Sequence, residues 1–268
     1  MTKSKPLALI TNDDGIDSWF LRTLVEAMLN DFEVVVAAPM GEQSWIGRAM
    51  SRRREVHYAE NETLGCKAYA LDGTPSDCVN IALGHLMDGR KPDVVCSGIN
   101  LGYNACLPLI LSSGTVAGAM EGAFWGLPAL AFSHVIPQVE FEAIREKHGR
   151  AEGEMAESVR CSAAISTRLA LAVVGQKPAS PVVHNINFPR RTYADTPVAR
   201  TIPSPMPMHS LFARRGESSF GFNKVEREPI PSGQLDDMEA LNADQISHTV
   251  LDLAAIAQSV PATSTASE

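Results

Sequence analysis

Residues 7–15, LALITNDDG, join a short apolar stretch to two adjacent aspartates and a glycine. An apolar run that stops at Asn12-Asp13-Asp14-Gly15 predicts a buried parallel strand ending at a sheet edge, where open α/β sheets bind their ligands. Two carboxylates placed there repel each other and lose hydration unless a cation or a shared proton compensates, and Mg²⁺ and Mn²⁺ favour oxygen ligands of this kind. The alternative is that one aspartate caps the helix that follows.

The length and composition of the chain limit the class of protein. Its 268 residues are 45% hydrophobic, enough for one large α/β domain, and the net charge of −8 argues against a general surface for nucleic-acid polymers. No segment has the ~18 uninterrupted apolar residues of a membrane span, and the stretch before Asp13 is too short for a secretory signal. The five cysteines form no CxxC pair, which favours reduced thiols in a cytoplasmic protein. We therefore expect a cytoplasmic location and neither nucleic acid nor membrane as a partner.

Strand-like and helix-like segments alternate along the first half of the chain. After the first strand, continuous apolar or extended stretches predict strands at 33–39, 54–59, 67–73, 92–100 and 127–133. Helical spacing predicts helices at 18–31, 76–87 (with Ser76 as the cap) and 112–126. Repeated βα units of this kind predict a doubly wound, mostly parallel sheet with right-handed crossovers.

The pattern changes beyond about residue 135. A charged surface excursion is expected at 138–158, a helix at 159–175, a late strand at 181–189, and a return to the core as strand or helix at 246–256. Residues 190–235 predict an irregular or hairpin-like extension, too poor in apolar residues to pack alone, that lies on another subunit. We expect a single domain over residues 1–260, with its core at about 7–189, the extension and C-terminal arm at about 190–256, and a disordered tail at 261–268.

Further polar side chains follow the other predicted strand ends. Ser44 follows the second strand, Asn100 ends a later one, Asn104 lies just beyond it, and Ser112-Ser113-Gly114-Thr115 opens a helix. Taken singly, these are ordinary loop, turn and cap residues. Because the strand ends lie side by side in a doubly wound sheet, two carboxylates, a hydroxyl, an amide oxygen and an anion-binding helix start would face one crevice. That combination favours metal-assisted chemistry on a phosphate.

Five motifs, in order and spacing, resemble those of the SurE family (survival protein E). They are TNDDGI (11–16), EQS with a glycine at 47 (42–47), DGTPSDCV (72–79), SGIN-x-G-x-N (97–104) and SGTV-x-x-A-x-EG (113–122), and NINFP (185–189) is similar to the family's late strand. The resemblance is strong over roughly 7–135 and weak over 181–256. It implies a Rossmann-like α/β core with an extended hairpin and a C-terminal arm for assembly into a homodimer or homotetramer.

The resemblance also implies an activity. It points to a divalent-metal-dependent 5′-nucleotidase that hydrolyses nucleoside 5′-monophosphates to nucleoside and phosphate, often with side activity on 3′-nucleotides or short polyphosphate. Carried onto this chain, the ligands of one Mg²⁺ or Mn²⁺ per subunit are Asp13, Asp14, Ser44 and Asn100.

A mechanism follows from that ligand set. The metal held by the catalytic pair Asp13 and Asp14 would neutralise phosphate charge and lower the pKa of a bound water, and that water, or less favourably Asp13 itself, would attack phosphorus in line. The transferred phosphate would be held by the side chain of Asn104 and by the N–H groups of Ser113, Gly114 and Thr115.

Two departures from the family pattern bear on the substrate. Trp45 stands where many members have glycine, and its ring could stack on a nucleobase or pack on a neighbouring loop or subunit. The segment 105–112, ACLPLILS, is one residue longer than usual and apolar where acidic residues are common. These departures leave two alternatives open: a non-catalytic metal- and nucleotide-binding sensor, or a phosphatase for another small phosphoester.

Overall fold

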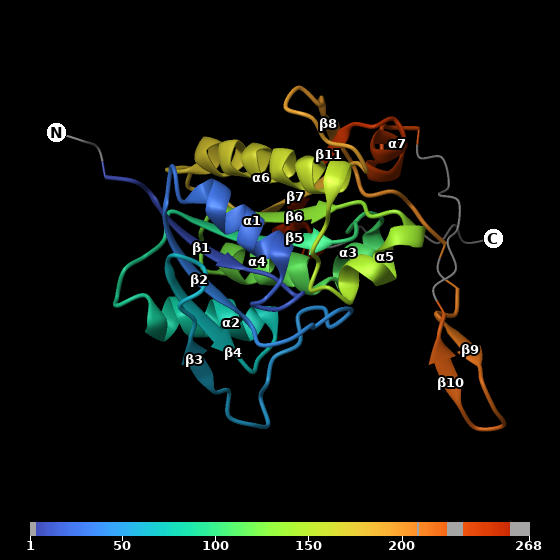
Figure 1. Ribbon diagram of the computed structural model, residues 1–268, viewed down its shortest axis with the longest axis horizontal. Coiled ribbons are helices and arrows are strands. Elements are labelled where there is room, and N and C mark those ends of the chain that lie inside the picture. Colours follow the sequence, from blue (N-terminus) through green and yellow to red (C-terminus); the bar gives the residue numbers. More distant parts are fainter. Residues whose placement is uncertain (1–3, 208, 224–232, 258–268) are drawn as a thin grey trace, which may run out of the picture.

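The computed structural model describes residues 4–207, 209–223 and 233–257. A nine-stranded sheet forms its centre, in the order β3-β4-β2-β1-β5-β6-β7-β11-β8 (Figure 1). The strands are β1 (Leu7–Thr11), β2 (Glu33–Pro39), β3 (Tyr58–Glu60), β4 (Lys67–Leu71), β5 (Val94–Leu101), β6 (Ala129–His134), β7 (Val182–Phe188), β8 (Val198–Thr201) and β11 (Ile246–Asp252).

The sheet is mostly parallel, as the alternating pattern predicted. Strands β4, β2, β1, β5, β6 and β7 pair in parallel, whereas β3 and β11 run antiparallel to β4 and β7. The chain builds outward from β1 through β2 to β4, then crosses over to β5 on the other side of β1. The doubly wound fold is therefore confirmed, and the reversal between β1 and β5 is the position at which such sheets bind ligands.

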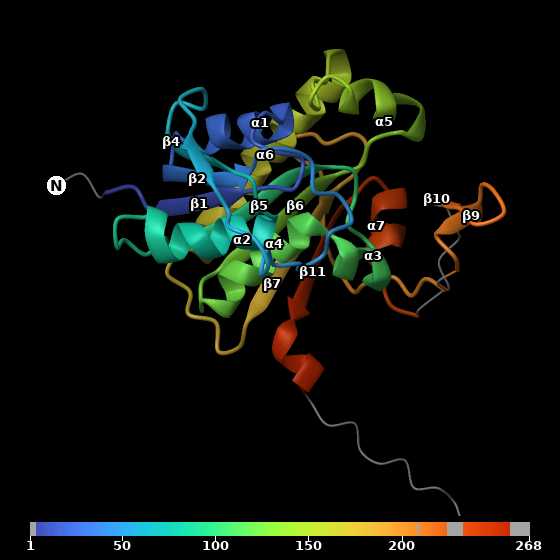
Figure 2. The ribbon, with the colours of Figure 1, turned by 90° about the horizontal axis from the view of Figure 1, so that it is seen from below.

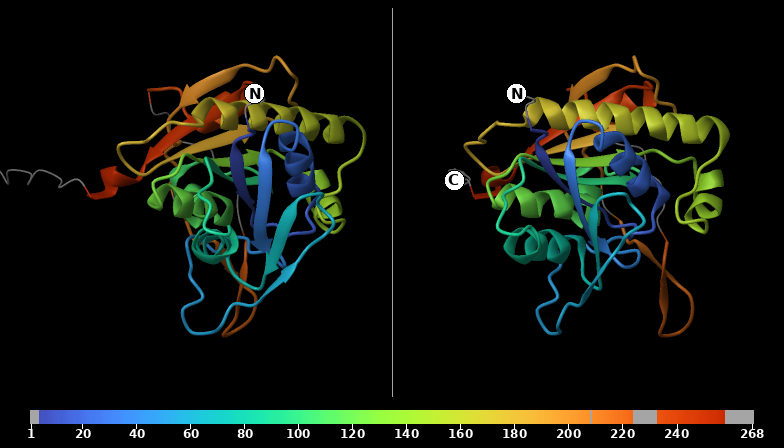
Figure 3. Two further views of the ribbon diagram at one scale, coloured as in Figure 1. Left: turned by 90° about the vertical axis from the view of Figure 1, so that its left-hand side faces the viewer. Right: turned by 60° about the vertical axis from the view of Figure 1, so that its left-hand side comes forward.

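Helices cover both faces of the sheet. Helices α1 (Trp19–Met28) and α6 (Gly153–Val173) pack on one face, and α2 (Pro75–Ile81), continued by the π-helix η1 (Ala82–Leu86), packs with α4 (Gly114–Phe124) on the other (Figures 1 and 3). The apolar face of α1 is fully buried in the larger core, at Phe20, Leu21, Leu24, Val25 and Met28. Since both sheet faces are covered, the central strands are apolar at nearly every position, and this is the pattern that identified them.

Two helix starts differ from the sequence prediction. Helix α2 is capped by Thr74 rather than by Ser76, because Thr74 and Asp77 form a reciprocal capping box and the Ser76 hydroxyl is buried against α4. Helix α6 begins at Gly153 instead of residue 159, and the excursion before it contains the short helix α5 (Gln138–Arg145).

The segments around residue 110 and beyond residue 190 also hold structure that the sequence did not predict. Residues 107–112 form a separate helix, α3 (Leu107–Ser112), because Ser113 is extended and interrupts the helical path before α4. The edge strand β8 extends the main sheet, and α7 (Asp237–Asn242) and the 3-10 helix η2 (Leu253–Ala257) flank β11.

The expected hairpin is present as β9 (Phe212–Arg214) and β10 (Phe220–Phe222), which projects away from the sheet (Figures 1 and 2). The predicted return to the core at 246–256 is β11 followed by η2. The predicted tail at 261–268 lies outside the described residues. No helix in the described part of the chain is long and apolar enough to cross a membrane.

Candidate active site

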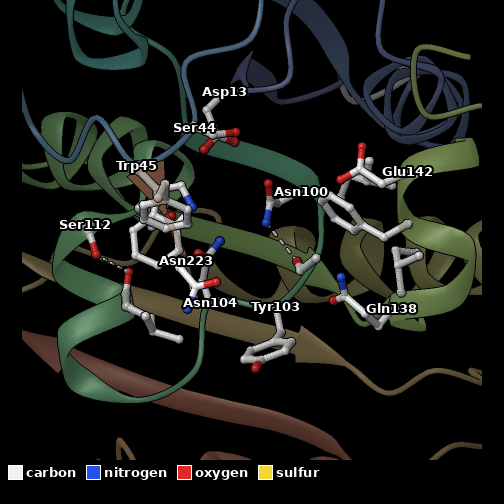
Figure 4. Close-up of a pocket in the computed structure, with 17 residues that line it drawn as sticks. Asp13, Ser44, Trp45, Asn100, Tyr103, Asn104, Ser112, Gln138, Glu142 and Asn223 are labelled. Atoms are coloured by element: carbon white, nitrogen blue, oxygen red, sulfur yellow. Dashed lines mark hydrogen bonds between the residues drawn. The ribbon is translucent and has the colours of Figure 1, made fainter. Parts of the chain in front are cut away.

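A pocket of about 680 Å³ opens beyond the ends of β1, β2 and β5. Six of the polar residues selected from the sequence line it, and Asp14 is not one of them: Asp13, Ser44, Asn100, Asn104, Ser112 and Ser113. In Figure 4, Asp13 and Ser44 lie at one end of the pocket, and Asn100 turns its side-chain oxygen toward them. Polar groups from four separate loops thus face one space.

Asp13 is a buried carboxylate held by the start of α4. The Thr115 hydroxyl donates a hydrogen bond of 2.5 Å to Asp13 Oδ1. Gly114 allows this approach, because a Cβ atom at that position would lie 2.8 Å from Asp13 Cβ and 2.9 Å from Asp13 Oδ2. Burial raises the pKa of Asp13 to about 6, and the hydrogen bonds from Thr115 oppose that rise. Thr115 therefore bonds to Asp13, and neither it nor Gly114 lines the pocket.

Asp14 sits beside Asp13 and is oriented by a neighbouring strand end. Its Oδ2 accepts a 3.0 Å hydrogen bond from the backbone N–H of Leu101, at the end of β5. Burial, and then the charge of Asp13, raise the pKa of Asp14 well above its ordinary value. The two carboxylates are therefore costly to keep ionised together in the absence of a cation.

Ser44 is linked to the rim of the pocket through Glu42. The Ser44 hydroxyl donates to Glu42 Oε1 at 2.7 Å, and Arg145 of α5 lies 3.3 Å from Glu42 Oε2. Arg145 also pairs with Glu142 at 2.9 Å. An acid and a base that the sequence analysis did not select thus fix the orientation of the Ser44 hydroxyl.

The loop that carries Ser44 is anchored at several points. The backbone N–H of Gln43 donates to the Asp13 carbonyl at 2.7 Å, and that of Gly47 donates to the Ser112 carbonyl at 2.9 Å. Arg48 pairs at 2.6 Å with the buried Glu121 of α4. This loop is therefore tied both to β1 and to α4.

The two asparagines have different environments. Asn100 donates through Nδ2 to the Gly102 carbonyl at 2.8 Å, which leaves its oxygen directed toward Asp13 (Figure 4). Asn104 is 7% exposed, and its Nδ2 donates to Ser133 Oγ at 2.8 Å. Its backbone is held by Asn185 and Asn187 of β7. Asn104 is thus a firmly held part of the pocket wall.

The donor set fits a hard divalent cation. It offers two carboxylates, a hydroxyl and an amide oxygen, all of them oxygen ligands. Across residues 4–207, 209–223 and 233–257, no ion pair involves Asp13 or Asp14. The same residues contain no group of three or more His, Cys, Asp or Glu side chains that could hold a metal. A divalent cation would compensate the charges of the buried Asp13 and the half-buried Asp14, and Ser44 and Asn100 would add neutral oxygen ligands.

Two parts of the pocket wall come from segments that the sequence analysis did not assign to the site. Gln138, Phe141 and Glu142 of α5 line one side, and Phe222 and Asn223 at the end of the hairpin line another. No local motif marks these residues, since only the tertiary path of the chain brings them to the strand ends. The Trp45 ring contacts Phe222, with centroids 4.9 Å apart.

Comparison with known proteins connects this geometry to a family. Residues 8–204 match the family model described as survival protein SurE. A protein from Methanocella arvoryzae, named 5'-nucleotidase SurE, is 35% identical over 72% of this chain and 70% of its own length. A protein of the same name from Anaeromyxobacter dehalogenans is 38% identical over 83% of this chain and 81% of its own length.

Other relatives match a shorter part of the chain or its fold. A 5'-nucleotidase SurE from Cytophaga hutchinsonii is 47% identical over 48% of this chain, and the match spans half of that protein's length. The crystal structure of the SurE protein from Aquifex aeolicus superposes with a TM-score of 0.68 and 27% identity, over 92% of this chain and 94% of that one. The resemblance found from the sequence motifs is confirmed by these matches.

Proposed function

The chain belongs to the SurE family, and we propose that it is a divalent-metal-dependent 5′-nucleotidase that hydrolyses nucleoside 5′-monophosphates to nucleoside and inorganic phosphate. One observation carries the proposal. The buried Asp13 lines a pocket of about 680 Å³ together with Ser44 and Asn100, a size typical of small-molecule sites, and neither it nor the adjacent, half-buried Asp14 forms an ion pair within the described residues.

The cation is assigned to Asp13, Asp14, Ser44 and Asn100, with Mg²⁺ or Mn²⁺ as the metal and one ion per subunit. When bound, it would neutralise phosphate charge and increase the acidity of water. Asp13 and Asp14 would orient that water in line with the phosphorus, and Asp13 as the nucleophile is the less favoured alternative. Because a carboxylate binds metal in its ionised form and burial raises the pKa of Asp13 to about 6, loading the site requires deprotonation of this carboxyl.

The phosphate contacts are assigned to Asn104 and Ser113, which line the pocket, and to the N–H groups at the start of α4. Thr115 has a second role, because its hydroxyl donates to Asp13 and thus acts on the phosphate through that carboxylate. Gly114 supplies the close approach of the helix to Asp13.

The proposal also covers the assembly of the subunits and the location of the protein in the cell. We assign the extension and its hairpin to contacts between subunits in a homodimer or homotetramer, supported by the exposed Phe212 and Tyr193 on this part of the chain. None of the five cysteines forms a disulfide, in keeping with a cytoplasmic location.

Release of inorganic phosphate tests the activity. AMP and GMP are incubated with the full chain and Mn²⁺ or Mg²⁺, and turnover should stop on addition of a chelator and return when metal is restored. Nucleotide binding without phosphate release under any metal would identify the sensor instead. A panel with 3′-nucleotides, short polyphosphate and other small phosphoesters separates a nucleotidase from a phosphatase of another substrate class.

A further inference from the structure

Two aromatic side chains from distant segments meet at the rim of the pocket. Trp45 directly follows Ser44 in the loop after β2, and Phe222 ends strand β10 of the hairpin. Their ring centroids lie 4.9 Å apart with planes inclined at 64°, an edge-to-face arrangement. Both rings line the pocket, with 41% of Trp45 and 47% of Phe222 exposed.

The backbone of Trp45 adopts a conformation that does not suit its side chain. Its φ of +60° lies in the left-handed region, which glycine enters freely and a bulky residue rarely adopts. Non-glycine residues persist in this region chiefly where function or surrounding structure requires them. The large exposed ring of Trp45 therefore calls for an explanation other than local folding preference.

The pocket is larger than a phosphate requires, and its walls differ: the acid Asp13 lies at one end and the aromatic ring of Trp45 lies on one side. Figure 4 shows Asp13 and Ser44 at one end, with Trp45 and Asn223 on one side and Glu142 and Gln138 across from them. A ligand whose phosphate lies against Asp13 would extend its other end past the Trp45 ring. Asn223 follows Phe222 directly and carries an amide that can both donate and accept hydrogen bonds.

We propose that Trp45 and Phe222 form the nucleobase subsite of this pocket, on which a planar heteroaromatic base stacks, with Asn223 at the base edge. The proposal rests on the nucleotidase function and names the group that sets substrate preference. Stacking tolerates any base, since every base has a π-face, and the two-ring purines present more area than the pyrimidines. Trp45 and Phe222 are thus specificity-determining residues and take no part in cleaving the phosphoester.

The test compares AMP with ribose 5-phosphate, which keeps the sugar and the phosphoester but lacks the base. Trp45→Ala and Phe222→Ala are each expected to raise KM for AMP by about 10- to 100-fold, the range of one lost base–aromatic stack, with little change in kcat. Kinetics on ribose 5-phosphate should stay unchanged. Trp45→Phe, which keeps a ring, should recover much of the AMP preference.

Phe220→Ala is the matched control, because Phe220 lies on the same strand β10 and is exposed but does not line the pocket. It should leave both substrates unaffected. Trp45→Gly relieves the positive φ, so its Tm should equal or exceed that of the wild type although the AMP preference is lost. Retention of the wild-type AMP preference in this variant would overturn the role of the Trp45 ring in the subsite.

The outcomes for subsite and function are separable. Equal losses on AMP and ribose 5-phosphate in the Trp45 and Phe222 variants would overturn the subsite while leaving the phosphatase intact. If no phosphoester is hydrolysed, the proposed function fails, and calorimetric titration of the wild type with AMP and ribose 5-phosphate still reads the subsite. Equal affinity for AMP and ribose 5-phosphate in this titration would overturn the nucleobase subsite.

Discussion

The Thr115 hydroxyl donates a 2.5 Å hydrogen bond to Asp13 Oδ1 across 102 positions of sequence. Thr115 is the second residue of α4, and Asp13 lies two residues beyond Thr11, the last residue of β1. The bond fixes one carboxylate oxygen and favours the ionised form against the burial that opposes it. Through this contact, the start of α4 acts on the pocket by orienting an acid.

Replacing Thr115 by valine removes the donor while keeping the shape of the side chain. We expect the pKa of Asp13 to rise further and the affinity for Mn²⁺ to fall by about 10- to 100-fold, as when the outer partner of a ligand is lost. Calorimetric titration with Mn²⁺ measures the affinity. Thr115→Ser keeps the hydroxyl and should stay close to the wild type, and equal affinities in the valine and serine variants would contradict the role given to this bond.

Asp14→Asn should separate activity from stability. The variant loses a charged ligand, and phosphate release from AMP is expected to drop below about a hundredth of the wild-type rate. Because Asp14 no longer repels Asp13, the metal-free protein should resist urea at least as well as the wild type at neutral pH. Asp17→Asn, an exposed acid in the same turn, is the control. Activity above about a tenth of the wild type would refute the ligand assignment.

Glu42 is expected to matter through Ser44. Glu42→Ala removes the acceptor that orients the Ser44 hydroxyl, so Mn²⁺ should bind about 10-fold more weakly while the fold is retained. Glu142→Ala is a matched control, since it removes the other acid that contacts Arg145 and leaves the bond between Glu42 and Ser44 in place. Should both variants bind Mn²⁺ equally weakly, the effect would come from the α5 contact and not from Ser44.

The sequence predicted the central strands and most of their helices because these elements are buried on continuous apolar faces. The runs at β1 and β2 are apolar at nearly every position, as is the first part of β5, because these strands are covered on both sides. The polar residues at or just beyond the ends of these strands, such as Asn100 and Asp13, line one pocket.

The elements that the sequence missed lack such a pattern. Strand β8 has four residues, VART, at the edge of the sheet, and its pairing with β11 is a tertiary event. Helix α3 has six residues, too few for periodicity to separate it from α4. The same reason applies to the pocket rim, because no local signal in the hairpin shows that Phe222 will meet Trp45.

A last prediction concerns acid stability and His134. This histidine ends β6, is fully buried, and contacts the hydroxyls of Ser162 and Ser158 of α6 at 3.1 and 3.4 Å. Burial lowers its pKa from 6.5 to about 3. Between these two values the unfolded chain binds a proton that the folded chain does not, so the free energy of unfolding falls as the pH drops below 6.5.

The size of this effect can be isolated by substitution. From pH 6.5 to about pH 5 the loss is roughly 2 kcal/mol, at about 1.4 kcal/mol per pH unit. Asp237 acts in the opposite sense, because burial raises its pKa to about 6 and the folded chain then binds the extra proton. The contribution of Asp237 is the same in the wild type and in His134→Gln, so it cancels when the two free energies of unfolding are subtracted. Urea unfolding with chelator present should therefore show the variant gaining about 2 kcal/mol relative to the wild type between pH 7.5 and pH 5. A difference that stays constant across this range would mean that His134 binds protons equally in the folded and the unfolded chain.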